Sequence, residues 1–256
     1  MSSSLLAHKH GAVAPLAPSW TIHPSGERLL IVELAGGDTV QANRMARAFA
    51  ARIVSARPDY VTDVVPALTT VGVHYDPARV PRDATRRMPF DTVRDALGAM
   101  LQTVDIVQRA TTRIVEIPVC YGGEHGPDLD EAACACNLSS AELIELHSRA
   151  PVDVMMLGFA PGHPYIGLFD ATLSLPRRAT PRTAVQPGSI GLANRQTVIY
   201  PLTLPGGWNL IGRTPLSLFA PSRAEPCLVQ AGDQVRFVPI SAAQFDALNE
   251  HPGASR

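Results

Sequence analysis

The sequence predicts an α+β N-terminal domain followed by a mainly β second domain. The first half alternates strand-like and helix-like segments in the order βαββαβ, which is the ferredoxin-like, split βαβ arrangement. Beyond residue 110, 15 of the 23 prolines and 13 of the 19 glycines separate short apolar segments, as in a compact barrel or sandwich. We therefore expect a disordered tail at residues 1–20 and domains at residues 21–120 and 121–256.

The elements of the first domain follow from hydrophobic periodicity. Apolar residues recur at helical spacing between residues 38 and 57, where Val40, Phe49 and Ile53 share one face. Two nearly contiguous β-branched runs predict a hairpin, and Asp91 is expected to cap a second helix. In chain order, the expected elements are strand 28–34, helix 38–57, strands 61–68 and 70–75, helix 91–109 and strand 113–119.

The second domain is expected to begin with helices and to continue as strands. A short helix is predicted at residues 127–136, and Ser139 with Glu142 forms a capping box that opens another helix ending near His147. Short apolar runs between Gly and Pro then predict strands. These strands are expected at residues 152–159, 189–193, 197–200, 208–211, 216–219 and 234–239, before a final helix at 242–249.

Composition excludes several classes of function. The net charge of −1 gives no overall field for nucleic acid or an anionic membrane. No apolar run reaches the ~18 residues that span a bilayer, and the N-terminus is a poor signal peptide, so a cytoplasmic protein is expected. The only lysine is Lys9, which excludes a P-loop lysine and covalently attached biotin within the predicted domains. The four cysteines lack regular spacing, so we expect free thiols and no metal site.

A glycine- and proline-rich stretch, GFAPGHPYIG at residues 158–167, fits neither a helix nor an ordinary strand. One interpretation is a rigid loop at the mouth of a barrel that presents His163 and Tyr165 to a cleft. The alternative is a structural turn filled by aromatic side chains. The stretch alone does not separate the two.

Three arginines lie within PRRATPR at residues 176–182. The two prolines reduce the entropy that Arg177, Arg178 and Arg182 would lose on binding an anion, and guanidinium groups suit carboxylate and phosphate. The alternative is that one or two of these arginines pair with Asp170 or with other acidic residues.

The stretch PGGWNLIGRTP at residues 205–215 is a third candidate. Gly206 and Gly207 can leave backbone amides free for an anion, Trp208 can form a pocket wall, and Arg213 can point into the same pocket. A β-turn followed by a core tryptophan explains the pattern equally well.

His147 is a candidate general acid or base. It lies at the predicted end of a helix, where the helix dipole favours the protonated form, and Glu145 is nearby. The alternative is a C-cap partner with no chemical role.

Taken in order, these motifs resemble one family. They include VCYGGEHGPDL, ELIELHS, VMMLGFAPGHPYIG, LPRRATPR, QPGSIGLANRQTVIYP, LPGGWNLIGRTP and AGDQVRF, preceded by GERLLIVEL, Asn43, VTDVVPAL and VHYDP. The family is that of the B-type 5-oxoprolinase subunits, also called allophanate hydrolase subunit 1 or the sporulation-kinase inhibitor family, which contains carboxyltransferase subdomains C and D. The resemblance covers roughly residues 25–239.

The resemblance implies a fold and a function. The fold would be a small α+β domain followed by a cyclophilin-like β-barrel. The function would be that of a hydrolase subunit, active only with its partners, in a complex that cleaves 5-oxoproline to L-glutamate with ATP as co-substrate. The implied partners are a second cyclophilin-like subunit and a lactam-processing subunit. Two alternatives are a histidine-kinase inhibitor and the carboxyltransferase part of a biotin-dependent urea or amide carboxylase, with biotin on another chain.

This sequence departs from the common family motif at His163, where the family more often has an aromatic residue. Arginines are expected to hold an anionic group, a histidine to transfer a proton and aromatic side chains to line the cleft. The candidates are Arg177, Arg182 and Arg213 for the anion, His147 or His163 for the proton, and Tyr165, Tyr200 and Trp208 for the cleft, with Gly206 and Gly207 beside it.

Overall fold

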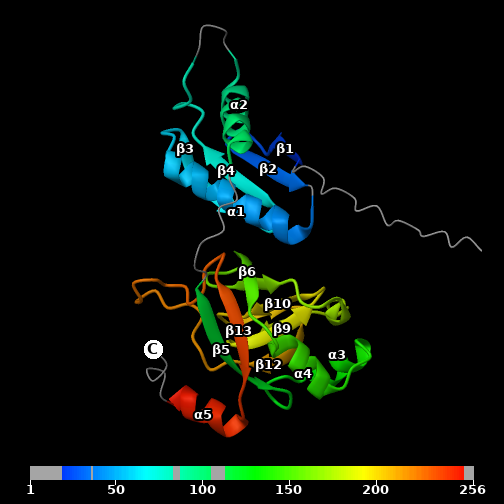
Figure 1. The fold of residues 1–256 in the computed structure, drawn as a ribbon. Coiled ribbons are helices and arrows are strands. Elements are labelled where there is room, and N and C mark those ends of the chain that lie inside the picture. The colour runs from blue at the N-terminus through cyan, green and yellow to red at the C-terminus, as the bar shows by residue number, and fades with distance from the viewer. Residues whose placement is uncertain (1–18, 36, 83–86, 105–112, 251–256) are drawn as a thin grey trace, which may run out of the picture.

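The computed structural model describes residues 19–35, 37–82, 87–104 and 113–250. Two bodies follow one another along the chain (Figure 1). The first is a sheet covered by two helices, and the second is a closed barrel with helices around it. No helix within the described ranges is long and apolar enough to cross a membrane.

The N-terminal body is a four-stranded antiparallel sheet in the order β1-β2-β4-β3. Buried side chains such as Leu30, Val32 and Val73 face the helices, where Phe49 and Leu97 meet them. Asp38 caps the first helix by accepting a hydrogen bond from the Gln41 amide. The elements are β1 (Ser19–Pro24), β2 (Leu29–Ala35), α1 (Thr39–Ala56), β3 (Val61–Pro66), β4 (Thr70–Tyr75) and α2 (Pro89–Gln102).

The predicted βαββαβ order is wrong at both ends. Residues 19 and 20, assigned to the tail, begin β1, which pairs with β2 along its whole length. The strand expected at 113–119 is β5 (Ile114–Tyr121), which belongs to the barrel. Strand β1 is the fourth strand of the N-terminal sheet, in the place expected for residues 113–119. Its Trp20 packs against Gly98 of α2. Residues 1–18 and 105–112 lie outside the described residues.

The second helix also begins earlier than predicted. Met88 is the N-cap residue, Pro89 is the first helical residue, and Asp91 lies in the first turn instead of at the cap. Proline suits this position because its nitrogen has no hydrogen to leave unpaired.

The barrel prediction is confirmed. Seven strands close in the order β10-β7-β6-β13-β5-β12-β9, and β9 pairs with β10 to complete the ring. All neighbours are antiparallel except β13 and β5. Side chains such as Ile117, Val154, Ile190 and Phe237 fill the interior. The strands are β5, β6 (Val152–Leu157), β7 (Pro164–Gly167), β9 (Ser189–Ala193), β10 (Gln196–Ile199), β12 (Asn209–Arg213) and β13 (Gln234–Pro239).

Elements around the barrel are partly as predicted. The capping box of Ser139 and Glu142 is confirmed at the start of α4. No strand forms at 216–219, where Phe219 makes a single bridge to Cys227, whereas residues 164–167 of the glycine-rich stretch do form strand β7. The remaining elements are α3 (Leu129–Ala135), α4 (Ser140–Ser148), a 3-10 turn (Ala171–Leu173), α5 (Ala242–Glu250), and a separate sheet of β8 (Arg182–Val185) with β11 (Leu204–Gly206).

Asn43 on α1 connects the two bodies. Its buried side-chain amide donates to the Leu68 carbonyl at 2.8 Å and to the Met155 carbonyl of β6 at 2.9 Å. Its oxygen accepts from Arg47 at 3.1 Å, and Arg44 forms an ion pair with Asp153 at 3.4 Å. Helix α1 is therefore held to the barrel at a defined point.

Candidate functional site

Four aromatic side chains lie together outside the barrel interior, and we call them the rim cluster: His163, Tyr165, Tyr200 and Trp208. Tyr165, Tyr200 and Trp208 pack with Val185 of β8 in a hydrophobic cluster separate from the one that fills the barrel. His163 precedes β7, and Tyr200 follows β10. These strands pair through Tyr165 and Val198, which brings His163 and Tyr200 together. The His163 ring lies 5.1 Å from Tyr165 and 5.4 Å from Tyr200, and Tyr165 lies 6.1 Å from Trp208 (ring centroids). The three cleft candidates named from the sequence therefore lie together with His163, one of the two candidates for proton transfer.

Arg177 joins the rim cluster from the arginine-rich stretch. Its guanidinium lies 4.6 Å from the centroid of the Trp208 ring, which is a cation–π distance. The side chain is exposed, whereas Trp208 is buried. Within the part of the chain that the structure describes, Arg177 forms no ion pair, so its charge is available to a ligand.

Burial keeps the polar members of the rim cluster uncharged. It lowers the pKa of His163 to about 4, and the positive charge of Arg177 acts in the same direction. Burial also raises the pKa of Tyr200 to about 12. The His163 Nδ1 and the Tyr200 hydroxyl are both buried and have no hydrogen bond of standard geometry within the described residues. Buried groups without such a bond are rare in proteins, and water or a ligand can supply the partner.

Phe159 covers the edge of this cluster. Its ring meets His163 edge-on at 5.4 Å, yet the side chain is 64% exposed. Its backbone has a φ of 73°, which is costly for an aromatic residue. An exposed aromatic side chain in a strained loop is typical of a contact residue.

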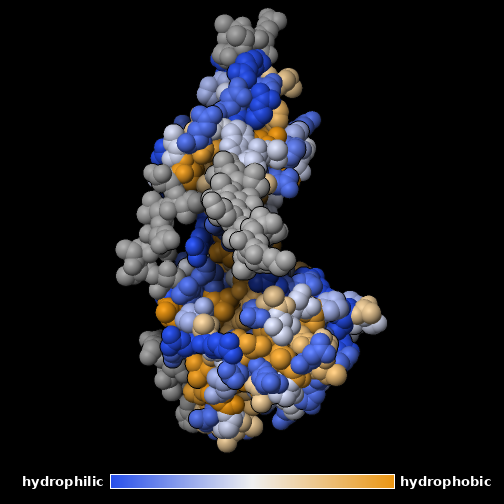
Figure 2. All heavy atoms as spheres, turned by 45° about the vertical axis from the view of Figure 1, so that its right-hand side comes forward, coloured by the Kyte–Doolittle hydropathy of each residue, from blue (hydrophilic) through white to orange (hydrophobic). Residues whose placement is uncertain are grey.

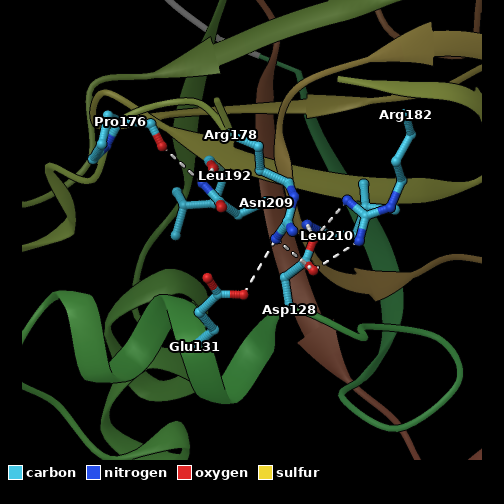
Figure 3. Close-up of polar contacts among 8 residues, drawn as sticks. All are labelled: Asp128, Glu131, Pro176, Arg178, Arg182, Leu192, Asn209 and Leu210. Atoms are coloured by element: carbon cyan, nitrogen blue, oxygen red, sulfur yellow. Dashed lines mark hydrogen bonds and ion pairs between the residues drawn. The ribbon is translucent and has the colours of Figure 1, made fainter. Parts of the chain in front are cut away.

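Arg178 and Arg182 are held by a buried carboxylate (Figure 3). Asp128, just before α3, accepts from Arg178 Nη1 at 3.0 Å and from Arg182 at 2.9 and 2.7 Å. Glu131 accepts from Arg178 at 3.2 Å. We call these four residues the Asp128 cluster. The alternative of paired arginines therefore describes Arg178 and Arg182, although their partner is Asp128 and not Asp170.

His147 lies inside the barrel, away from the rim cluster. It is fully buried, stacked on Phe169 at 4.8 Å and tilted against Phe237 at 4.3 Å. Its ring nitrogens form hydrogen bonds with the Tyr121 hydroxyl at 2.7 Å and the Thr197 hydroxyl at 2.9 Å. Burial lowers its pKa to about 3, so the expectation of a protonated histidine is wrong. Desolvation outweighs the helix dipole here.

The other candidates are placed as follows. Arg213 donates to the Pro187 carbonyl at 2.9 Å and lies over the ring of Phe245 on α5, so it does not contact the rim cluster. A side chain at Gly206 would clash with the Tyr200 hydroxyl, and the Gly207 carbonyl accepts from the Arg178 amide at 2.7 Å. Gly206 therefore allows the close approach of Tyr200, and Gly207 joins the arginine-rich stretch through its backbone.

Sequence reasoning missed Asp128 and Phe159. Asp128 sits in a Pro-Asp pair at a helix start, which signals a helix cap, and its arginine partners lie 50 and 54 positions further along. Phe159 lies within the glycine-rich stretch, but its exposure depends on the loop conformation, which the sequence pattern does not give.

Two surface pockets lie elsewhere on the molecule, one beside α1 and β3 and one between α1 and residues 167–170. Neither is lined by a rim-cluster residue.

Comparisons with known proteins agree with the fold. The model of the family described as carboxyltransferase domain, subdomain C and D, matches residues 20–229. The B-type 5-oxoprolinase subunit of Bacillus subtilis (strain 168) is 38% identical over 90% of this chain and 97% of that protein. The B-type 5-oxoprolinase subunit of Escherichia coli O157:H7 is 40% identical over 84% of this chain and 93% of that protein. The crystal structure of the Kluyveromyces lactis urea carboxylase matches 98% of this chain and 25% of its own length with a TM-score of 0.72, and its 16% identity indicates a shared fold only.

Proposed function

Because the chain belongs to the family of the carboxyltransferase domain, subdomain C and D, we propose that it is a subunit of a 5-oxoprolinase complex. The observation that carries the proposal is the similarity, over nearly the whole chain, to curated 5-oxoprolinase subunits of the B type. A match that covers both proteins almost end to end supports the same role more strongly than a shared domain would.

The proposed reaction is hydrolysis of 5-oxoproline to L-glutamate, driven by hydrolysis of ATP. ATP is a co-substrate of the whole complex, since this sequence contains no GxxxxGK[ST] phosphate-binding motif. The proposed partners are a second cyclophilin-like subunit and a lactam-processing subunit. Figure 2 shows apolar side chains gathered on one face of the barrel, and exposed apolar surface is typical of contacts between subunits.

The rim cluster is the proposed substrate site. Arg177 binds the carboxylate of the substrate, because its guanidinium has no ion pair with the residues that the structure describes and is oriented by Trp208. His163 is neutral at pH 7 and can accept or donate a proton, whereas the hydrogen-bonded core position of His147 does not suit that role. Tyr165 and Tyr200 line the site.

Reconstitution tests the proposal. The chain is purified with its partner subunits, each subunit is omitted in turn, and 5-oxoproline-dependent ATP hydrolysis is measured. We expect activity to vanish without this chain and Arg177→Ala to raise KM by about tenfold or more, the cost of one charged hydrogen bond. Arg236→Ala, an exposed arginine on β13, is the control and should change KM less than about twofold.

The outcomes separate the alternatives. Full activity without this chain would refute the subunit role. A stable complex without 5-oxoproline activity would instead favour a different amide or urea-like substrate, as in a carboxyltransferase. Inhibition of a histidine kinase by the chain alone would favour the regulatory alternative.

A further inference from the structure

We propose that Asp128 is a positioning residue for the rim cluster. Asp128 binds the side chains of Arg178 and Arg182 and so fixes the segment that carries Arg177. Arg177 therefore stays over the Trp208 ring, and its N–H groups remain open to an anionic ligand. The inference rests on the proposed role of Arg177, and it concerns a residue that contacts no ligand itself.

Asp128 has its hydrogen-bonding capacity filled by two other segments of the chain. Besides the arginines, its carboxylate accepts from the Leu210 amide at 2.7 Å, and its own amide donates to the Leu210 carbonyl at 2.9 Å. The side chain is only 5% exposed. It therefore joins the start of α3, the arginine segment at 176–182 and strand β12 at one point (Figure 3).

The backbone on either side of Arg177 forms hydrogen bonds with the residues on either side of Trp208. The Pro176 carbonyl accepts from the Asn209 side chain at 2.9 Å. The Arg178 amide donates to the Gly207 carbonyl at 2.7 Å. With residues 176 and 178 bonded to residues 209 and 207, Arg177 lies opposite Trp208. The guanidinium groups bound to Asp128 hold the same segment at a further point.

Charge explains why Arg177 remains available. The Asp128 cluster contains two carboxylates and two guanidinium groups, so it carries no net charge when all four are ionised. The charge of Arg177 is not balanced in this way. Stacking uses one face of the guanidinium and leaves its edge N–H groups for carboxylate or phosphate. A group already oriented loses less entropy when a ligand binds.

The test uses tryptophan fluorescence and kinetics together. The protein has two tryptophans, so Trp20→Phe leaves Trp208 as the only reporter. In this background, Asp128→Asn should increase acrylamide quenching of Trp208 about threefold and, in the reconstituted complex, raise KM for 5-oxoproline about tenfold while kcat changes less than about threefold.

Asp233→Asn is the matched control. Asp233 is also buried, and it accepts from Arg113 and from the Gln230 amide, but it contacts no rim-cluster residue within the described residues. Both variants lose stability: Asp128→Asn removes the carboxylate that binds two arginines and the Leu210 amide, and Asp233→Asn removes the one that binds Arg113 and the Gln230 amide. Only Asp128→Asn should alter Trp208 quenching and KM. Equal effects in both variants would overturn the positioning role.

A milder variant covers the case in which Asp128→Asn does not fold. Arg182→Gln removes part of the Asp128 cluster and should change quenching and KM in the same direction, about threefold for KM. If Asp128→Asn or Arg182→Gln folds and changes neither, Asp128 does not position Arg177. If Arg177→Ala itself has no effect on KM, it is the proposed substrate site that fails.

Discussion

His147 and His163 are two buried histidines of one barrel, and their surroundings differ. Both are packed by aromatic rings, and burial lowers the pKa of both. His147, in the interior, has a hydrogen bond at each ring nitrogen. His163, in the rim cluster, has no hydrogen-bond partner at Nδ1 within the described residues, and the exposed Phe159 and Arg177 lie near it.

The difference shows that burial and a lowered pKa do not identify a functional histidine. Completed hydrogen bonds mark His147 as a residue that specifies the core. Among the described residues, His163 differs in having an Nδ1 without a hydrogen-bond partner and in lying near the exposed Arg177, as the proposed site requires. Three substitution experiments can break or sharpen this distinction.

The largest effect is expected in the core. His147→Ala should lower the free energy of unfolding by about 3–4 kcal/mol, because it opens a cavity and leaves the hydroxyls of Tyr121 and Thr197 unpaired. Urea denaturation measures the loss. His125→Ala is the control, since His125 is half-buried against Phe245, and it should cost about 1 kcal/mol or less. A loss at His147 no greater than at His125 would contradict the core assignment.

The next effect concerns activity. His163→Asn should lower kcat of the reconstituted complex about 100-fold, the usual contribution of a proton-transferring group. The free energy of unfolding should change by less than about 1 kcal/mol, since the His163 Nδ1 forms no hydrogen bond with another described residue that the substitution would remove. The measurement is 5-oxoproline-dependent ATP hydrolysis beside urea denaturation of the same sample. Unchanged kcat would remove His163 from the chemistry.

The smallest effect is the pH dependence of stability. Folding lowers both histidine pKa values below 6.5, so the unfolded chain binds more protons, and stability present above pH 6.5 is lost as the pH falls towards 4. Between pH 6 and 5, each histidine should contribute roughly 1 kcal/mol per pH unit. His147→Ala and His163→Asn should each reduce the slope by that amount. If neither variant changes the slope of stability against pH, then burial does not lower the pKa of His147 and His163 in the folded state.

Local pattern predicted much of the barrel. Residues 189–193 and 234–239 form strands within the predicted bounds, because each is a short apolar run between turn residues. Strand β1 was missed because most of its side chains are exposed and give no apolar alternation. Strand β5 was recognised as a strand but placed in the wrong sheet, since its parallel partner β13 begins at Gln234, far along the chain.

Local sequence patterns also predicted part of the candidate site. The aromatic residues and Arg177 come from segments rich in glycine and proline, and the structure brings these segments together. That His147 is buried in the barrel interior depends on how α4 packs against β10 and β13. The Asp128 cluster depends on contacts between segments about 50 residues apart. Neither can be derived from local spacing.

The position of strand β1 also determines where this chain could be joined to a related chain in a chimaera. Because β1 lies at the edge beside β2, the N-terminal sheet takes all four strands from residues 19–75, and the barrel takes all seven from beyond residue 113. A crossover between related genes at the connection would cut neither sheet. A chimaera would need to match the contacts of α1 with the barrel, which include the Asn43–Met155 hydrogen bond and the Arg44–Asp153 ion pair.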